Sequence, residues 1–142
     1  MATTTSIKLV IPSRVRFVDL AHTAAEKMAE TAGFDADEAL NIGLAVREAA
    51  INAIVHGNGR DPERQVRISL TTGPQALEVK VRDQGNGFNP DQTPDPVSDD
   101  NLLSTSGRGL LLIRAFVDEV VFRQRKDGME IILKKRLNPD HE

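Results

Sequence analysis

The chain has 142 residues, the length of one ordinary domain, and its 18 basic and 21 acidic side chains give a formal net charge of −3. This balance argues against a nucleic-acid binder, which needs a basic face or stripe, and the absence of cysteine excludes a disulfide framework, a thiolate metal site and a cysteine nucleophile. Because no apolar run approaches the roughly 20 residues of a membrane span and the N-terminus lacks a secretory pattern, we expect a soluble, cytoplasmic protein.

The N-terminal part of the chain predicts one strand followed by two helices. Residues 7–11 form a short apolar run that a proline stops, which is typical of a strand. Over residues 14–33, apolar side chains recur at helical spacing. Asp35, with Glu38 three residues later, resembles a capping box that opens a second helix. This helix is expected over residues 35–56, with the following glycines ending it.

The C-terminal part predicts two hairpins separated by a long loop and a short helix. Gly73-Pro74 and Asp127-Gly128 are expected to turn the hairpins. Residues 83–106 show little periodicity and are rich in Gly, Pro, Asp and Ser. The predicted elements are strands at residues 65–71 and 77–81, a helix at 109–116, and strands at 120–125 and 130–137.

The order of these elements predicts an α+β sandwich in one domain spanning residues 1–142. We expect a mixed, mostly antiparallel sheet with the helices packed on one face. Residues 89–106 carry four aspartates and no basic side chain, and a loop of that length is typically a lid or a disordered segment. Residues 138–142 are expected to fray.

A polar stripe runs along the otherwise apolar second helix. Glu48, Asn52 and His56 are spaced at i, i+4 and i+8 and therefore lie along one side. In a structural interpretation, Glu48 pairs with a basic neighbour, Asn52 caps a loop, and His56 is a cation favoured at the helix C-terminus. In a functional one, Glu48 accepts a proton and Asn52 helps to hold a Mg²⁺ ion that bridges phosphates. The helix alone does not decide between them.

Two glycine clusters flank the long loop. In residues 83–88, glycines two apart let the backbone approach a ligand closely, and Asp83 can accept a hydrogen bond from an amino group such as that of adenine. Residues 107–110 open a helix, whose free N–H groups and dipole suit a phosphate. Each cluster alone is equally compatible with an ordinary turn or helix start. If the loop between them is a lid that closes over a nucleotide, both glycine clusters would belong to one nucleotide site.

In this order, the features resemble the nucleotide site of the gyrase, histidine-kinase and heat-shock ATPase superfamily, which has the Bergerat fold. Residues 48–57 resemble its N box, residues 83–88 its first glycine box and residues 107–113 its second. The following residues 117–120 resemble one branch, the anti-sigma factor serine/threonine kinases, which are short stand-alone domains. The resemblance covers nearly the whole chain and implies a Bergerat-type ATP-binding fold.

The resemblance implies a role for each matching residue. Glu48 would be the general base that activates a substrate hydroxyl, and Asn52 would coordinate Mg²⁺ between the phosphates of ATP. Asp83 would bind the adenine amino group, and the second glycine box would contact phosphate, mostly through its backbone. The implied ATP-binding set is Asn52, His56, Asp83, Gly85, Gly87, Phe88, Thr105, Ser106, Gly107, Arg108, Gly109 and Leu110.

Two positions depart from the pattern of some members. Met129 stands where some carry a threonine near the adenine-binding aspartate, which leaves the second adenine contact open. Thr105 stands where some carry an arginine that faces the terminal phosphate, and Arg108 is the candidate substitute for it.

The implied function is an anti-sigma factor with ATP- and Mg²⁺-dependent serine/threonine kinase activity. It would phosphorylate a small anti-anti-sigma protein and sequester a sigma factor, as a homodimer that contacts neither nucleic acid nor membrane. The alternative is a non-catalytic ATP-binding module that switches a sigma factor or a phosphatase, and Glu48 favours the kinase over it. A fragment of a two-component histidine kinase is disfavoured, because the sequence around His22 does not resemble a phospho-accepting motif.

Overall fold

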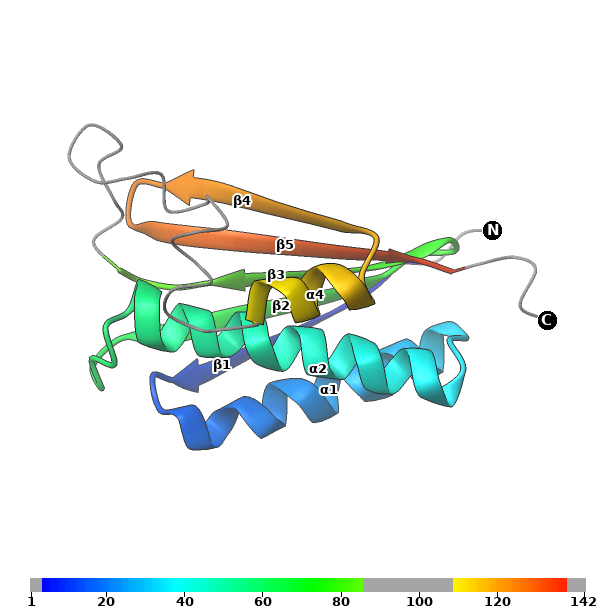
Figure 1. Ribbon diagram of the computed structural model, residues 1–142, viewed down its shortest axis with the longest axis horizontal. Coiled ribbons are helices and arrows are strands. Elements are labelled where there is room, and N and C mark those ends of the chain that lie inside the picture. Colours follow the sequence, from blue (N-terminus) through cyan, green and yellow to red (C-terminus); the bar gives the residue numbers. More distant parts are fainter. Residues whose placement is uncertain (1–3, 86–108, 138–142) are drawn as a thin grey trace.

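The computed structural model of the chain describes residues 4–85 and 109–137. These residues form a five-stranded sheet in the order β1-β2-β3-β5-β4, and every pairing in it is antiparallel. Helices α1, α2 and α4 cover one face of the sheet (Figure 1). The strands are β1 (Thr5–Pro12), β2 (Gln65–Thr72), β3 (Ala76–Arg82), β4 (Glu119–Arg125) and β5 (Gly128–Arg136). The helices are α1 (Val18–Ala32), α2 (Ala36–Asn52) and α4 (Gly109–Phe116).

Local signals set the boundary between α1 and α2. Gly33 takes a left-handed conformation, φ 110°, and its N–H bonds the carbonyls of the last turn of α1. Asp35 then caps α2, because its Oδ1 accepts a hydrogen bond from the Glu38 N–H at 2.8 Å. The expected capping residue is confirmed. The helix predicted at residues 14–33 begins with a 3₁₀ turn, Val15–Phe17.

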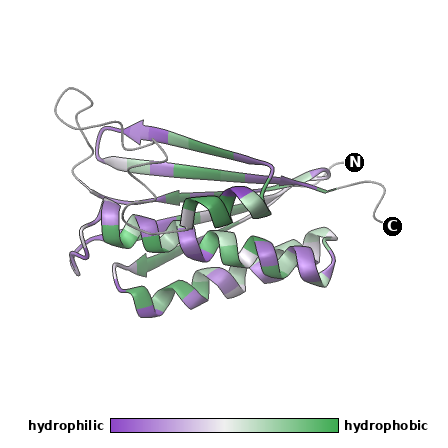
Figure 2. Cartoon of the chain, in the orientation of Figure 1, coloured by the Kyte–Doolittle hydropathy of each residue, from purple (hydrophilic) through white to green (hydrophobic). Residues whose placement is uncertain are grey.

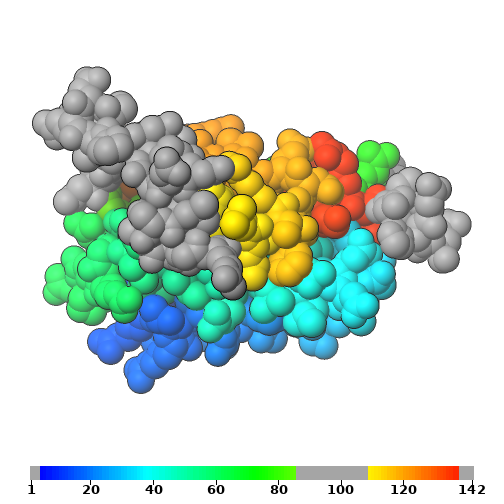
Figure 3. Space-filling model, in the orientation of Figure 1, coloured from blue at the N-terminus to red at the C-terminus, as the bar shows by residue number. Residues whose placement is uncertain are grey.

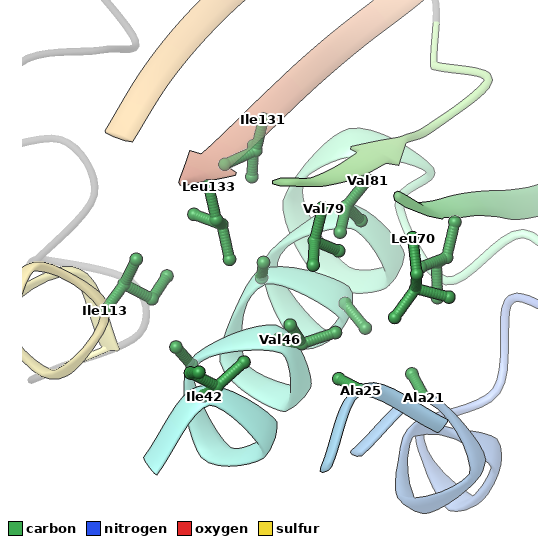
Figure 4. Close-up of a cluster of buried hydrophobic side chains, with 14 of the residues drawn as sticks. Ala21, Ala25, Ile42, Val46, Leu70, Val79, Val81, Ile113, Ile131 and Leu133 are labelled. Atoms are coloured by element: carbon green, nitrogen blue, oxygen red, sulfur yellow. The ribbon is translucent and has the colours of Figure 1, made fainter. Parts of the chain in front are cut away.

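The core lies between the sheet and the helices and is mainly aliphatic, with Phe34 also buried in it (Figures 2 and 4). Strand residues alternate, so the apolar ones face the helix layer and the polar ones face the uncovered side. Alanines such as Ala21 and Ala25 of α1 are fully buried against α2 and let the two helices approach closely. Helix α4, yellow in Figure 3, packs beside α2.

Helix α2 does not end as an α-helix but widens into a π-helical turn, Ala53–Gly57 (η2). The Asn58 N–H closes this turn on the Ala53 carbonyl at 2.8 Å, five residues back. The prediction of a continuous α-helix to residue 56 is therefore wrong over its last turn. Single π turns occur frequently at functional sites.

The predicted fold class is confirmed, with a sheet that is antiparallel throughout the described strands. The last hairpin turns one residue earlier than expected, at Lys126-Asp127, because Arg125 pairs with Gly128 in the sheet. The expected lid and frayed tail, residues 89–106 and 138–142, lie outside the described residues. None of the helices within residues 4–85 and 109–137 is long and apolar enough to cross a membrane.

Candidate functional site

Three segments distant in sequence meet at one end of the sheet, and glycines line their contacts. A Cβ atom on Gly57, which ends the π turn, would lie 1.9 Å from Oδ2 of Asp83. On Gly85 it would lie 2.1 Å from the Gly57 carbonyl oxygen, and on Gly128 2.3 Å from the Asp83 carbonyl oxygen. Real Cβ atoms do not approach so closely, so each position accepts only glycine without a shift of the chain.

Asp83, at the end of β3, is the charged group around which these glycines pack. It is 5% exposed, and its Oδ1 accepts hydrogen bonds from the N–H groups of Gly85 and Met129, each at 3.0 Å. Burial raises the pKa of this carboxyl, and the two hydrogen bonds together with the charges of Arg64 and Arg82 oppose that rise. Both bonds go to Oδ1, whereas Oδ2 packs against the π turn, so the carboxylate is held in one orientation.

Asn52, the last residue of α2, is the buried polar group of the predicted stripe. It is 4% exposed, and within the described part of the chain neither Oδ1 nor Nδ2 has a hydrogen-bond partner. Buried polar groups are normally paired, so an unpaired amide needs an explanation. The interpretation in which Asn52 caps a loop receives no support from these contacts, whereas an amide oxygen of this kind is a suitable Mg²⁺ ligand.

Glu48 lies one helical turn before Asn52 and is half-buried, with 22% of its side chain exposed. Its ion pair with Arg47 is long, 3.9 Å between Oε1 and Nη1. Arg47 instead donates from Nε to Asp19 at 3.1 Å. The structural interpretation, in which a basic neighbour neutralises Glu48, is therefore weak, and the carboxylate remains suited to accepting a proton.

His56 lies within the π turn and is exposed. Partial desolvation, and then the charge of Arg60, lower the pKa of His56 below its ordinary value of 6.5. This lowered pKa disfavours the cation that the structural interpretation places at this helix end.

The structure describes only part of the predicted second glycine box. Gly109 and Leu110 begin α4 and are buried, Leu110 to 1% exposure. Their contact with a nucleotide stays a prediction. The predicted residues Gly87, Phe88, Thr105, Ser106, Gly107 and Arg108 lie outside the described residues.

Sequence reasoning missed two residues that pack against Asp83, Gly57 and Gly128. Gly57 was expected only to end the second helix and the N-box-like run, and Gly128, φ 154°, only to turn the last hairpin and begin the last strand. At Met129 it is the backbone N–H that donates a hydrogen bond to Asp83. The departure from threonine at that position therefore leaves this contact intact.

The chain is similar in sequence to a family of ATPase domains and to known bacterial proteins. A family model described as a histidine kinase-like ATPase domain matches residues 11–135. The serine-protein kinase RsbW of Bacillus subtilis (strain 168) is 31% identical over 140 residues, covering 93% of this chain and 86% of that protein. The anti-sigma F factor of Geobacillus thermodenitrificans (strain NG80-2) is 36% identical over 104 residues, covering 71% of each chain.

A solved structure is similar in fold. The histidine kinase domain of the blue-light activated histidine kinase from Erythrobacter litoralis EL346 matches with a TM-score of 0.53 at 22% identity, covering 89% of this chain and 62% of that one. All the site residues described above fall within the matched span of the family model.

Proposed function

The chain belongs to the histidine kinase-like ATPase family, and from this membership we propose that it is an anti-sigma factor with ATP-dependent protein serine/threonine kinase activity. It phosphorylates a small anti-anti-sigma protein and sequesters a sigma factor, in the cytoplasm and as a homodimer. The names of the two bacterial relatives, a serine-protein kinase and an anti-sigma factor, support this assignment. The structural observation that carries it is the buried amide of Asn52, one turn beyond Glu48, which has no hydrogen-bond partner among residues 4–85 and 109–137.

Asp83 supplies the recognition of adenine in this proposal. An ionised carboxylate accepts hydrogen bonds only, and the amino group of adenine donates them. Because Gly85 and Met129 hold Oδ1 through their N–H groups, the carboxylate does not reorganise when the base binds. The close approach of glycine backbones to Asp83 keeps side chains away from the carboxylate.

Asn52 fits the role of a Mg²⁺ ligand through its buried amide oxygen, which has no partner among the described residues. In the described ranges, no group of three His, Cys, Asp or Glu side chains is placed to hold a metal. An ion at Asn52 would therefore take its remaining ligands from phosphate oxygens and water, as is usual for Mg²⁺. When bound, Mg²⁺ neutralises the charge that develops on the phosphates.

Glu48 supplies the proton transfer. Its carboxylate takes the proton of the substrate serine or threonine hydroxyl as that oxygen forms a bond to the γ-phosphorus of ATP. The bond from the γ-phosphorus to the bridging oxygen breaks, and ADP leaves with that electron pair. Most of the rate acceleration comes from positioning and charge neutralisation, because phosphoryl transfer needs little covalent help from the protein.

Phosphoryl transfer tests this function directly. The purified chain is incubated with radiolabelled ATP, Mg²⁺ and candidate anti-anti-sigma proteins, and label is expected on one of them. Glu48→Gln should lower the transfer rate by about 100-fold or more while leaving ATP affinity nearly unchanged. Glu63→Gln, the same change of carboxylate to amide at an exposed position outside the predicted site residues, is the matched control and should transfer normally.

Two outcomes would change the assignment. Normal transfer by Glu48→Gln would show that this carboxylate is not the base. Tight ATP binding with no labelled candidate would favour the non-catalytic switching module instead.

A further inference from the structure

Asn58 follows the π turn directly, and its side chain joins three other segments of the chain. It is 1% exposed, and both ends of its amide are bonded. Its Oδ1 accepts a hydrogen bond from the Gln84 N–H at 2.6 Å. Its Nδ2 donates to Ser13 Oγ at 2.7 Å and to the Gln65 carbonyl at 3.0 Å. The end of β1, the start of β2 and the segment after β3 are thereby tied to the end of α2.

The backbone around Asn58 is held as firmly as its side chain. Its N–H closes the π turn on Ala53 at 2.8 Å, and its carbonyl accepts from the Asp61 N–H at 3.1 Å. Ser13 in turn donates from Oγ to the Arg64 carbonyl at 2.9 Å. A buried network in which every member is satisfied rigidifies the segments that it connects.

This network borders the site because residues 57 and 58 lie opposite residues 83 and 84. Gly57 lies against the Asp83 carboxylate, and the next residues, Asn58 and Gln84, are hydrogen-bonded. The side chain of Gln84 is also fixed, because its Oε1 accepts from the Gln65 N–H at 2.7 Å. The hydrogen bond that the Gln84 N–H donates to Asn58 therefore links the π turn directly to the chain that carries Asp83.

We propose that Asn58 is a positioning residue for nucleotide recognition: its amide fixes the backbone at Gln84 and so holds the Asp83 carboxylate in the orientation that receives the adenine amino group. Asn58 itself does not touch the nucleotide. The asparagine amide combines an acceptor oxygen with a nitrogen that has two donors, and the three partners observed match this set. The inference rests on the proposed function through the role of Asp83 as the adenine acceptor.

The test compares the affinities of ATP and ITP, which differ at the position of the adenine amino group. A site built to hydrogen-bond that group discriminates against an analogue without it. We expect the wild type to prefer ATP. Asn58→Ala should weaken ATP binding by about fivefold to tenfold, the loss of about one hydrogen bond. ITP binding should change by less than about twofold, so the preference largely disappears. A general loss of structure would lower both affinities together.

Ser13→Ala is the matched control. It removes the partner at the far end of the Asn58 amide, but it leaves the bond to Gln84 and the bond to the Gln65 carbonyl in place. We expect this variant to lose thermal stability and to keep the wild-type preference for ATP. If Asn58→Ala does not fold, Asn58→Ser is measured instead, with the same expectation.

The outcomes separate this inference from the proposed function. A wild type that prefers ATP, with Asn58→Ala keeping that preference or losing ATP and ITP affinity equally, overturns the positioning role alone. A wild type that does not distinguish ATP from ITP overturns the role of Asp83 and the inference with it.

Discussion

Asp83 is a buried carboxylate whose surroundings act on it in opposite directions. Burial raises its pKa, and hydrogen bonds from the Met129 and Gly85 N–H groups lower it, with a net rise. An acid with a raised folded-state pKa stabilises the fold below its ordinary pKa, here 3.8, and loses that contribution as the pH rises through the raised value. At neutral pH the ionised Asp83 therefore lowers stability, which is the expected signature of a functional carboxylate.

Asp83→Asn separates these two effects. The asparagine oxygen can still accept from both N–H groups, while the buried charge is removed. We expect the free energy of unfolding at pH 7 to rise, because the raised pKa means that the ionised carboxylate costs stability in the folded state. We expect ATP affinity to fall by about tenfold or more. Thermal unfolding across the pH range and ATP titration measure the two quantities.

The stability difference between Asp83→Asn and the wild type should shrink as the pH falls through the raised pKa of folded Asp83, and it should level off below the ordinary value of 3.8. A variant that is less stable than the wild type at neutral pH would contradict the cost assigned to this charge.

Single residues of the site could be predicted where a short stretch of sequence identifies them. The spacing of Glu48 and Asn52 on one helix face and the position of Asp83 after a strand are visible in the sequence, and the structure places all three at one end of the fold. Gly57 and Asn58 act through contacts with residues more than 25 positions away. No periodicity or spacing encodes such contacts, so only the folded chain reveals them.

At the scale of elements, α1 and α2 pack closely because Gly43 faces His22. A Cβ atom on Gly43 would lie 2.6 Å from His22 Cδ2 and 3.0 Å from the His22 carbonyl oxygen. The ring is also held in place, since Nε2 lies 2.9 Å from Glu26 Oε1. This contact sets the distance between the two helices.

Gly43→Ala should therefore destabilise the protein, although alanine favours a helix by about 1 kcal/mol over glycine. We expect a net loss of about 1–2 kcal/mol from overpacking. Adding His22→Ala should recover part of that loss, because the ring is what the new methyl group meets first. Urea unfolding of both single variants and the double variant gives the coupling energy. Additive effects would argue against the contact.

The elements were predictable to within a few residues, apart from two local features. The strand and helix periods and the Asp35 cap gave boundaries close to those observed. The π turn was not visible, because its single extra residue leaves the apolar pattern of α2 nearly unchanged. The last hairpin was displaced by one residue, because Gly128 belongs to the strand and not to the turn.

At the scale of the whole molecule, the order of elements predicted a sheet with helices on one face, but it did not predict the strand order. Hairpins made β2–β3 and β4–β5 neighbours from the sequence alone. The pairing of β3 with β5 joins residues 76–82 to 130–136 across a long segment, and no local signal indicates it. This pairing brings Asp83 beside Met129 and so completes the site.

Nucleotide binding should stabilise the two layers together, since Asn52 lies in the helix layer and Asp83 at the end of the sheet. ATP with Mg²⁺ at about 100 times its Kd should add about 2.7 kcal/mol to the free energy of unfolding. Thermal unfolding followed by circular dichroism measures this as an upward shift of Tm. EDTA should reduce the shift, because Asn52 would then hold no ion.

Asn52→Leu provides the control for the ion. Its ATP-dependent shift in Tm should be small and insensitive to EDTA. Without nucleotide it should be more stable than the wild type, because leucine replaces a buried amide with no described partner. A wild-type shift that EDTA does not change would count against Mg²⁺ at Asn52.

The link between Asp83 and β5 also bears on synthesis of the protein. Helix α2 and strands β1 to β3 emerge from the ribosome first, yet Asp83 lacks its contacts with Met129 until the last described strand has been made. Contacts between distant parts of a chain form late in folding, because closing the intervening loop costs entropy. We therefore expect a nascent chain to complete the proposed nucleotide site only after β5 has been made, because a chain that stops before β5 lacks the Met129 contact with Asp83.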